Sequence, residues 1–222
     1  MTSMKSFTSS VARPLPVVIL ADVSGSMSVD GKIAALNTAL REMVASCANE
    51  DGRAEIHLAI VTFGGAGAHL HLPLTPASAV ALSPLLASGG TPMGAAFDMA
   101  QALIEDRAVV PSRAYTPAIV LVSDGQPNDE WQGPLGALLS APRAAKAQRF
   151  ALGVGEDADA GVLRQFLNDP EGRVYSAQDA GQIQSFFRWV TMSVTARSRS
   201  ATPNVAASVA IEFEPMGLDV LV

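Results

Sequence analysis

The sequence has few charged side chains and a single cysteine, and both shortages restrict what the protein can be. Charged residues make up 16% of the 222 residues and leave a formal net charge of −6. An acidic protein without a lysine or arginine cluster has no general attraction to phosphate backbones, so we expect no nucleic acid as its main partner. Cys47 has no second cysteine to pair with, and its neighbours indicate a helix face and a buried thiol.

No apolar run of membrane-spanning length is present near the N-terminus. The run over 15–21 is too short to cross a bilayer and is followed at once by Asp22. It also lacks a convincing small-residue cleavage site, so we expect neither a signal peptide nor a membrane segment. A cytoplasmic location, without membrane contact, is the expectation by default.

Apolar residues, by contrast, are plentiful, and they fall in runs that alternate between two periods. They make up 49% of the chain, which is enough for the core of one domain. We expect strands over about 15–22, 53–63, 68–74, 117–123, 150–154 and 173–176. We expect helices over about 31–48, 78–87, 92–109, 133–146, 159–168 and 179–196. Pro142 can break the fourth of these.

This alternation predicts an α/β fold with a doubly wound, mostly parallel sheet of about six strands and helices on both faces. The strand over 68–74 alternates polar and apolar residues after a glycine-rich turn, so we expect it to be an antiparallel edge strand. Acidic residues are expected to cap the helices that follow Asp30 and Asp159.

The expected domain covers 14–197. Residues 1–13 are rich in serine and threonine and are expected to be flexible. Residues 198–222 form a C-terminal extension. Its stretch over 205–213 is expected either to add a strand to the sheet edge or to dock on a partner.

Three oxygen-bearing side chains follow the first strand, in the stretch LPVVILADVSGSMS. Asp22, Ser24 and Ser26 occupy alternate positions, and side chains two apart in an extended segment point the same way. They would converge just past the carboxyl end of a buried strand, which is where open α/β sheets bind ligands. Capping of the next helix is the alternative interpretation of these residues.

Two further loops carry oxygen donors. Thr91 stands between Gly89-Gly90 and Pro92, and Asp124 follows the strand over 117–123. With the first group, these residues make a set of two carboxylates and three hydroxyls. Such oxygen-only sites suit Mg²⁺, Mn²⁺ or Ca²⁺ and do not suit zinc or copper.

The segments DVSGS, GTP and SDG, which begin at Asp22, Gly90 and Ser123, resemble the metal-ion-dependent adhesion site of von Willebrand factor A domains. The resemblance covers about 15–197 and implies that Ser24 and Ser26 ligate the ion directly. It implies that Thr91 ligates directly or through water, and that Asp22 and Asp124 act largely through water or hydrogen bonds. An aspartate or glutamate of a partner protein would complete the shell.

The chain also resembles a narrower group, the small bacterial von Willebrand factor A proteins of tellurite-resistance clusters. The stretches LPVVILADVSGSM and GGTPMGAAFDMA carry this resemblance. It implies a cytoplasmic stress-response or phage-defence assembly, with a protein kinase and a PP2C-type phosphatase encoded nearby.

We therefore expect a non-enzymatic, metal-dependent module that binds a protein. The first alternative is a divalent-metal hydrolase, such as a phosphatase, that uses the same oxygen cluster; no general base or nucleophile beyond the ligands is evident. The second is a structural subunit in which the metal only steadies the loops.

Other polar residues near these loops are weaker candidates for a functional site. Asp30, Asp129 and Glu130 lie near the expected site rim, either as extra ligands or as solvated loop charges. His69 and His71 share a strand face, for which solvation is the better interpretation than metal binding. The stretch GSMSVDGK over 25–32 has the wrong spacing for a phosphate-binding loop.

Overall fold

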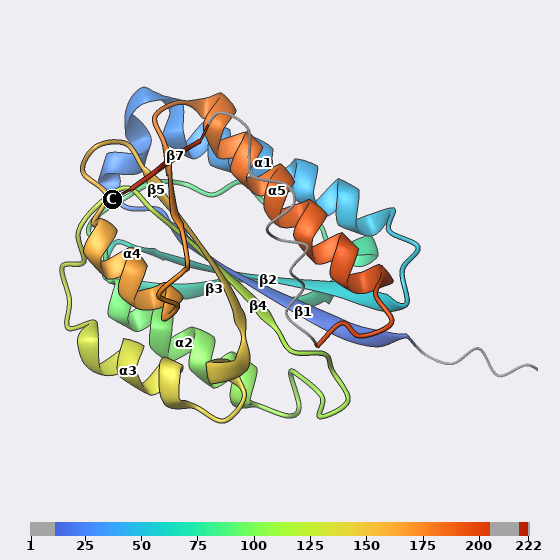
Figure 1. Cartoon of the computed structure of the whole chain (residues 1–222). Coiled ribbons are helices and arrows are strands. Elements are labelled where there is room, and N and C mark those ends of the chain that lie inside the picture. Colours follow the sequence, from blue (N-terminus) through green and yellow to red (C-terminus); the bar gives the residue numbers. More distant parts are fainter. Residues whose placement is uncertain (1–11, 205–217, 222) are drawn as a thin grey trace, which may run out of the picture.

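The computed structural model describes residues 12–204 and 218–221. Its strands form one sheet in the order β3-β2-β1-β4-β5-β6-β7 (Figure 1). The strands are β1 (Arg13–Asp22), β2 (Ala54–Gly64), β3 (Gly67–Pro76), β4 (Ala118–Ser123), β5 (Gln148–Val154), β6 (Val174–Ala177) and β7 (Asp219–Val220).

The five interior strands run parallel, and both edge strands run against them. β3 pairs antiparallel with β2, as its alternating pattern predicts. β7 pairs antiparallel with β6, so the described sheet has one strand more than the six expected. The C-terminal extension supplies this strand, while the strand expected over 205–213 lies outside the described residues.

Five α-helices cover the two faces of the sheet: α1 (Lys32–Ala48), α2 (Met93–Glu105), α3 (Gln132–Ser140), α4 (Ala160–Leu167) and α5 (Ala180–Arg199). Figure 1 shows α1 and α5 on one face and α2, α3 and α4 on the other. The side chains of β1 alternate between two cores, with Ile19 in the core beneath α1 and α5 and Leu20 in the opposite one. An uninterrupted apolar strand is therefore buried on both faces.

The strand order places two loops side by side. β1 lies between β2 and β4, so the connections after β1 and β4 leave the same edge of the sheet for different neighbours. In doubly wound sheets, such a reversal opens a crevice outside the carboxyl ends of the strands. The ends of β1 and β4 are Asp22 and Ser123.

The helix expected over 78–87 does not form, and this prediction is corrected. Only the 3₁₀ helix η2 (Ala77–Ala79) forms there, and the chain then runs without regular structure to α2. Asn37 of α1 holds this segment, because its Nδ2 donates to the carbonyl of Leu85 at 2.9 Å and its Oδ1 accepts from the Leu85 N–H at 2.7 Å. Pro84 has no N–H for a helical hydrogen bond.

Asp30 does not cap α1, which is a second correction. The 3₁₀ helix η1 (Gly25–Gly31) leads into α1, and its last two residues both have positive φ, 54° at Asp30 and 71° at Gly31. This left-handed pair turns the chain so that α1 begins at Lys32 without a side-chain cap. Asp159 does cap α4, since its carboxylate accepts from the N–H of Val162 at 3.0 Å.

The helix expected over 92–109 is too long. α2 ends at Glu105 rather than near 109, because Asp106 leaves the helical conformation and its carboxylate accepts from the N–H of Ala108. The helix expected over 133–146 breaks at the place that Pro142 indicates, into α3 and the 3₁₀ helix η3 (Ala144–Lys146). No helix among the described residues has both the length and the apolar character that crossing a membrane requires.

Candidate metal centre

Asp22 ends β1 and turns the chain toward η1. Its Oδ1 accepts from the N–H of Ser24 at 2.8 Å, and its Oδ2 accepts from the hydroxyl of Ser123 at 2.6 Å. The first bond is an aspartate turn, in which a side chain bonds backbone two residues on. The second joins the ends of β1 and β4, so this carboxylate fixes the two loops to each other.

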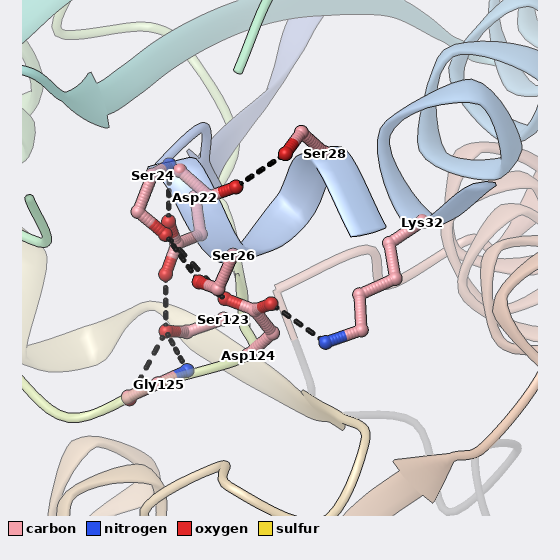
Figure 2. A network of polar contacts seen from close by, with 9 residues as sticks. Asp22, Ser24, Ser26, Ser28, Lys32, Ser123, Asp124 and Gly125 are labelled. Carbon is pink, nitrogen blue, oxygen red and sulfur yellow. Dashed lines mark hydrogen bonds and ion pairs between the residues drawn. The ribbon is translucent and has the colours of Figure 1, made fainter. Parts of the chain in front are cut away.

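The hydroxyls of the first loop meet the carboxylate of the second (Figure 2). Ser26 Oγ donates to Asp124 Oδ1 at 2.7 Å, and Ser24 Oγ lies 3.4 Å from the same oxygen. The two hydroxyl oxygens are 3.0 Å apart. Four of the five residues expected to surround an ion are thus brought together from the loops after β1 and β4.

Thr91 approaches from the loop before α2. It is 8% exposed, and its Oγ1 lies 3.8 Å from the position that a Cβ on Gly125 would take, directly after Asp124. Its carbonyl accepts from the N–H of Asn128 at 3.1 Å, which ties the loop before α2 to the loop after β4. The fifth expected donor therefore borders the same cluster.

Two glycines allow this third loop to come close. Gly89 has a φ of +70°, and a Cβ there would overlap the backbone of Gly65. A Cβ on Gly90 would overlap the side-chain amide of Asn128. The carbonyl of Gly89 also accepts from the N–H of Gly25 at 2.8 Å, so the loop before Thr91 lies directly on the loop that carries the serines.

Lys32 completes the cluster, and sequence reasoning missed it. Its Nζ lies 2.8 Å from Asp124 Oδ2, the oxygen that the serines do not use. Its only sequence signal is its place in the stretch over 25–32, whose spacing does not match a phosphate-binding loop. The contact depends on the turn at Asp30 and Gly31, whose geometry the sequence does not reveal.

The acidic residues of the rim have structural partners. Asp129 accepts from the N–H groups of Gly94 and Ala95 and so caps α2 from the loop after β4. Glu130 accepts from the N–H of Gly133 at 2.9 Å, in the first turn of α3. Both carboxylates therefore stabilise helix starts, and Glu130 is also exposed, as expected of a solvated loop charge.

The two site carboxylates lie close together in a buried place. Asp22 is 0% exposed, and burial raises the pKa of its carboxyl above 3.8; hydrogen bonds from Ser123 and Ser24 oppose this, and the charge of Asp124 adds to it. A divalent cation among these oxygens would remove the cost of two neighbouring buried negative charges. The chemistry of the donor set therefore fits a hard cation.

Histidines and further acidic groups do not form a competing site in the part of the chain that the structure describes. No group of three or more His, Cys, Asp or Glu side chains there is placed to hold a metal. His71 Nε2 lies 3.0 Å from the carbonyl of Ser83, and His57 lies 2.7 Å from Glu55. The candidate centre therefore depends on hydroxyls, with only two carboxylates.

The arrangement of these loops agrees with a match between residues 17–189 and the family model for the von Willebrand factor type A domain. This match covers more than half of the sequence. The chain belongs to this family. Von Willebrand factor A domains are typically metal-dependent modules for protein interaction or adhesion, and most of the relatives are not enzymes.

Solved structures of the same fold come from varied organisms. A von Willebrand factor type A protein from Catenulispora acidiphila shares 24% identity with a TM-score of 0.62, over 81% of this chain and 42% of that one. Proximal thread matrix protein 1 of the mussel byssus, in a form with zinc in its metal-ion-dependent adhesion site, shares 16% identity with a TM-score of 0.65, over 83% and 48%. Manganese-loaded TRAP protein from Plasmodium vivax shares 20% identity with a TM-score of 0.59, over 78% and 72%.

These likenesses establish the fold and do not by themselves establish a ligand for this chain. The chain spans less than half the length of the first two structures. No curated protein matches the sequence.

Proposed function

We propose that the cluster at the carboxyl ends of β1 and β4 binds a divalent cation and, through it, an acidic side chain of a partner protein. Ser24, Ser26 and Thr91 would supply hydroxyl ligands, and Asp22 and Asp124 would hold the ion through water or hydrogen bonds. Mg²⁺ is the proposed physiological ion, with Mn²⁺ and Ca²⁺ as substitutes. The supporting observation is that Ser26 and Ser24 direct their hydroxyls to one buried oxygen of Asp124.

The donor set suits an ion that keeps an open position. Hydroxyls are neutral ligands, and only two carboxylates are present, so a bound dication retains much of its charge. A carboxylate from outside can then join the shell and gain from that charge. The metal would supply this electrostatic attraction, while the protein orients the hydroxyls and shields the carboxylates of Asp22 and Asp124 from solvent.

The site also explains why specificity would lie in the neighbouring loops. The loops that follow β1, precede α2 and follow β4 surround the cluster, and caps and close glycine contacts hold them in place. A partner that reaches the ion must contact them as well. Their exposed side chains would select among acidic partners.

The decisive experiment compares two serines of one loop. Ser26→Ala removes a hydroxyl from the cluster, whereas Ser28→Ala removes an exposed hydroxyl that donates to the Gly25 carbonyl outside it. We expect Mn²⁺ binding, measured by calorimetry, to fall at least about tenfold in Ser26→Ala and to stay unchanged in Ser28→Ala. Equal affinities for both variants and the wild type would refute the site.

The enzyme alternative needs its own assay. The wild type and Asp22→Ala would be incubated with p-nitrophenyl phosphate and Mg²⁺ or Mn²⁺. Turnover that depends on the metal and disappears in Asp22→Ala would favour a hydrolase over an interaction module. Capture of a protein partner that EDTA and Ser26→Ala both abolish, without turnover, would support the module.

The finer resemblance supports a more specific proposal about context. The stretches LPVVILADVSGSM and GGTPMGAAFDMA are like those of bacterial von Willebrand factor A proteins from tellurite-resistance clusters. We propose a cytoplasmic role in such a stress-response or phage-defence system, with a kinase and a PP2C-type phosphatase as partners. Metal-dependent association with a kinase and phosphatase encoded beside this protein would support it, and association that ignores EDTA would contradict it.

A further inference from the structure

A lysine lies on the site carboxylate that the serines use. Lys32 Nζ is 2.8 Å from Asp124 Oδ2, while Asp124 Oδ1 accepts the hydroxyl of Ser26. Figure 2 shows Lys32 approaching Asp124 from a different side than the serines. The ammonium therefore leaves the hydroxyl side of the cluster open and can remain in place when an ion occupies that side.

The fold makes room for this lysine. Lys32 is the first residue of α1, directly after the left-handed pair Asp30 and Gly31. On the loop after β5, a Cβ at Gly155 would come within 3.2 Å of Lys32 Nζ, and Gly155 has a φ of +78° that favours glycine. Three loops at the carboxyl edge of the sheet thus surround the ion pair.

Burial makes the pair electrostatically important. The Asp124 side chain is 0% exposed and that of Lys32 is 19% exposed, so solvent screens their charges less than those of a surface pair. Asp22 and Asp124 together bring two negative charges when ionised, and Lys32 cancels one. An arriving dication meets half of the net negative charge that the two carboxylates alone would offer.

We infer that Lys32 is an internal cation that lowers the affinity of this site for divalent metal. The inference rests on the proposed metal site and adds a control on its occupancy. The ammonium and the dication would share the carboxylate of Asp124, and their Coulomb repulsion would act in a buried site where solvent screens it weakly. Removal of the positive charge should therefore tighten metal binding, although it also removes a hydrogen bond to Asp124.

The test measures Mn²⁺ affinity by electron paramagnetic resonance of the free ion, at fixed pH and ionic strength. Lys32→Met removes the charge and keeps the aliphatic stem, and Lys32→Gln removes the charge and keeps a hydrogen-bond donor. We expect both to bind Mn²⁺ roughly tenfold more tightly than the wild type. Lys32→Arg should stay near the wild type, because the charge remains.

Lys146 provides the matched control. It is exposed in η3, just before the start of β5. This is the end of the sheet at which the parallel strands begin, whereas the site lies where they end. Lys146→Met changes the net charge by the same amount and should leave Mn²⁺ affinity unchanged. Equal tightening in Lys146→Met would show a general charge effect and overturn the assignment to Lys32.

The outcomes separate this inference from the proposal beneath it. If the wild type binds Mn²⁺ and Asp124→Ala weakens that binding, the metal site stands. If Lys32→Met and Lys32→Gln then bind Mn²⁺ as tightly as the wild type or more weakly, only the role of Lys32 is refuted. If the wild type does not bind Mn²⁺, or if Asp124→Ala binds it equally tightly, the metal site itself is refuted.

Discussion

The carboxylate of Asp129 accepts from the N–H of Gly94 at 3.0 Å, across 35 residues of sequence. Its other oxygen accepts from the N–H of Ala95 at the same distance. A side chain of the loop after β4 therefore caps α2, the helix that follows Thr91. Since Gly94 has no side chain, the backbone of Glu130 can lie directly against it.

This cap predicts a measurable loss of stability. Asp129→Ala leaves two N–H groups in the first turn of α2 without their acceptor, so we expect the free energy of unfolding to fall by about 1–2 kcal/mol. Metal binding should weaken as well, because the loop that carries Thr91 then keeps only the Asn128 N–H bond to its carbonyl and loses the Asp129 tie to the loop after β4. Urea denaturation and Mn²⁺ titration provide the two measurements. Asp98→Ala, an exposed position on the same helix, is the control and should change neither.

Asn37 predicts a different pattern, a stability loss without a large loss of metal affinity. Its buried amide satisfies both backbone groups of Leu85, so Asn37→Leu leaves a buried donor and acceptor unpaired. We expect a destabilisation of about 2–4 kcal/mol in urea denaturation, since each unpaired buried group costs about 1–3 kcal/mol. Asn49→Ala removes an exposed side-chain bond to the Ala45 carbonyl and should cost far less. Comparable losses for the two variants would contradict this account.

The buried thiol offers a test of the packing between α1 and α5. Burial raises the pKa of Cys47 to about 12, and the charge of Glu50 adds to the effect. The thiolate is the reactive form, so at pH 8 the native protein should react with Ellman's reagent at least about 100-fold more slowly than the protein unfolded in guanidinium. Unfolded protein should release one equivalent of chromophore, from the one cysteine. Equal rates in both states would show that the packing here is wrong.

The general fold could be predicted because its signals are local or topological. Uninterrupted apolar runs mark strands buried on both faces, and β1 and β4 follow this pattern. Alternation along an extended segment predicted that Asp22, Ser24 and Ser26 converge past the end of β1. Their meeting with Asp124 was implied by the resemblance to the metal-ion-dependent adhesion site. The antiparallel β3 followed from its alternating residues.

The remaining details depend on contacts between residues far apart in sequence. Apolar residues over 78–87 have a spacing that suits a helix, but hydrogen bonds from Asn37 hold Leu85 in a non-helical segment. Asp129 follows a strand as a ligand would, yet its partners are N–H groups in the first turn of α2. The contact of Lys32 with Asp124 requires a left-handed turn at Asp30, which is uncommon for a residue other than glycine.

Asp22 should destabilise the protein when no metal is present. Its pKa is raised above 3.8, chiefly by burial, so the folded state favours the protonated carboxyl. The contribution of this group to stability is therefore greatest below pH 3.8 and is lost as the pH rises through the raised pKa. In Asp22→Asn, which cannot ionise but keeps an oxygen to accept from the Ser24 N–H, this loss disappears.

In EDTA at pH 7, we therefore expect the melting temperature of Asp22→Asn to equal or exceed that of the wild type. As the pH falls toward 3.8, the wild type gains stability and the melting temperature of the variant should fall relative to it. With saturating Mg²⁺ the order should reverse, because the ion stabilises the ionised wild type and binds the variant weakly. Differential scanning fluorimetry across pH, with EDTA or Mg²⁺, measures both effects. A variant that melts below the wild type in EDTA at pH 7 would show that the ionised Asp22 carboxylate stabilises the metal-free fold. A variant that gains as much from Mg²⁺ as the wild type does would show that this carboxylate does not help to hold the ion.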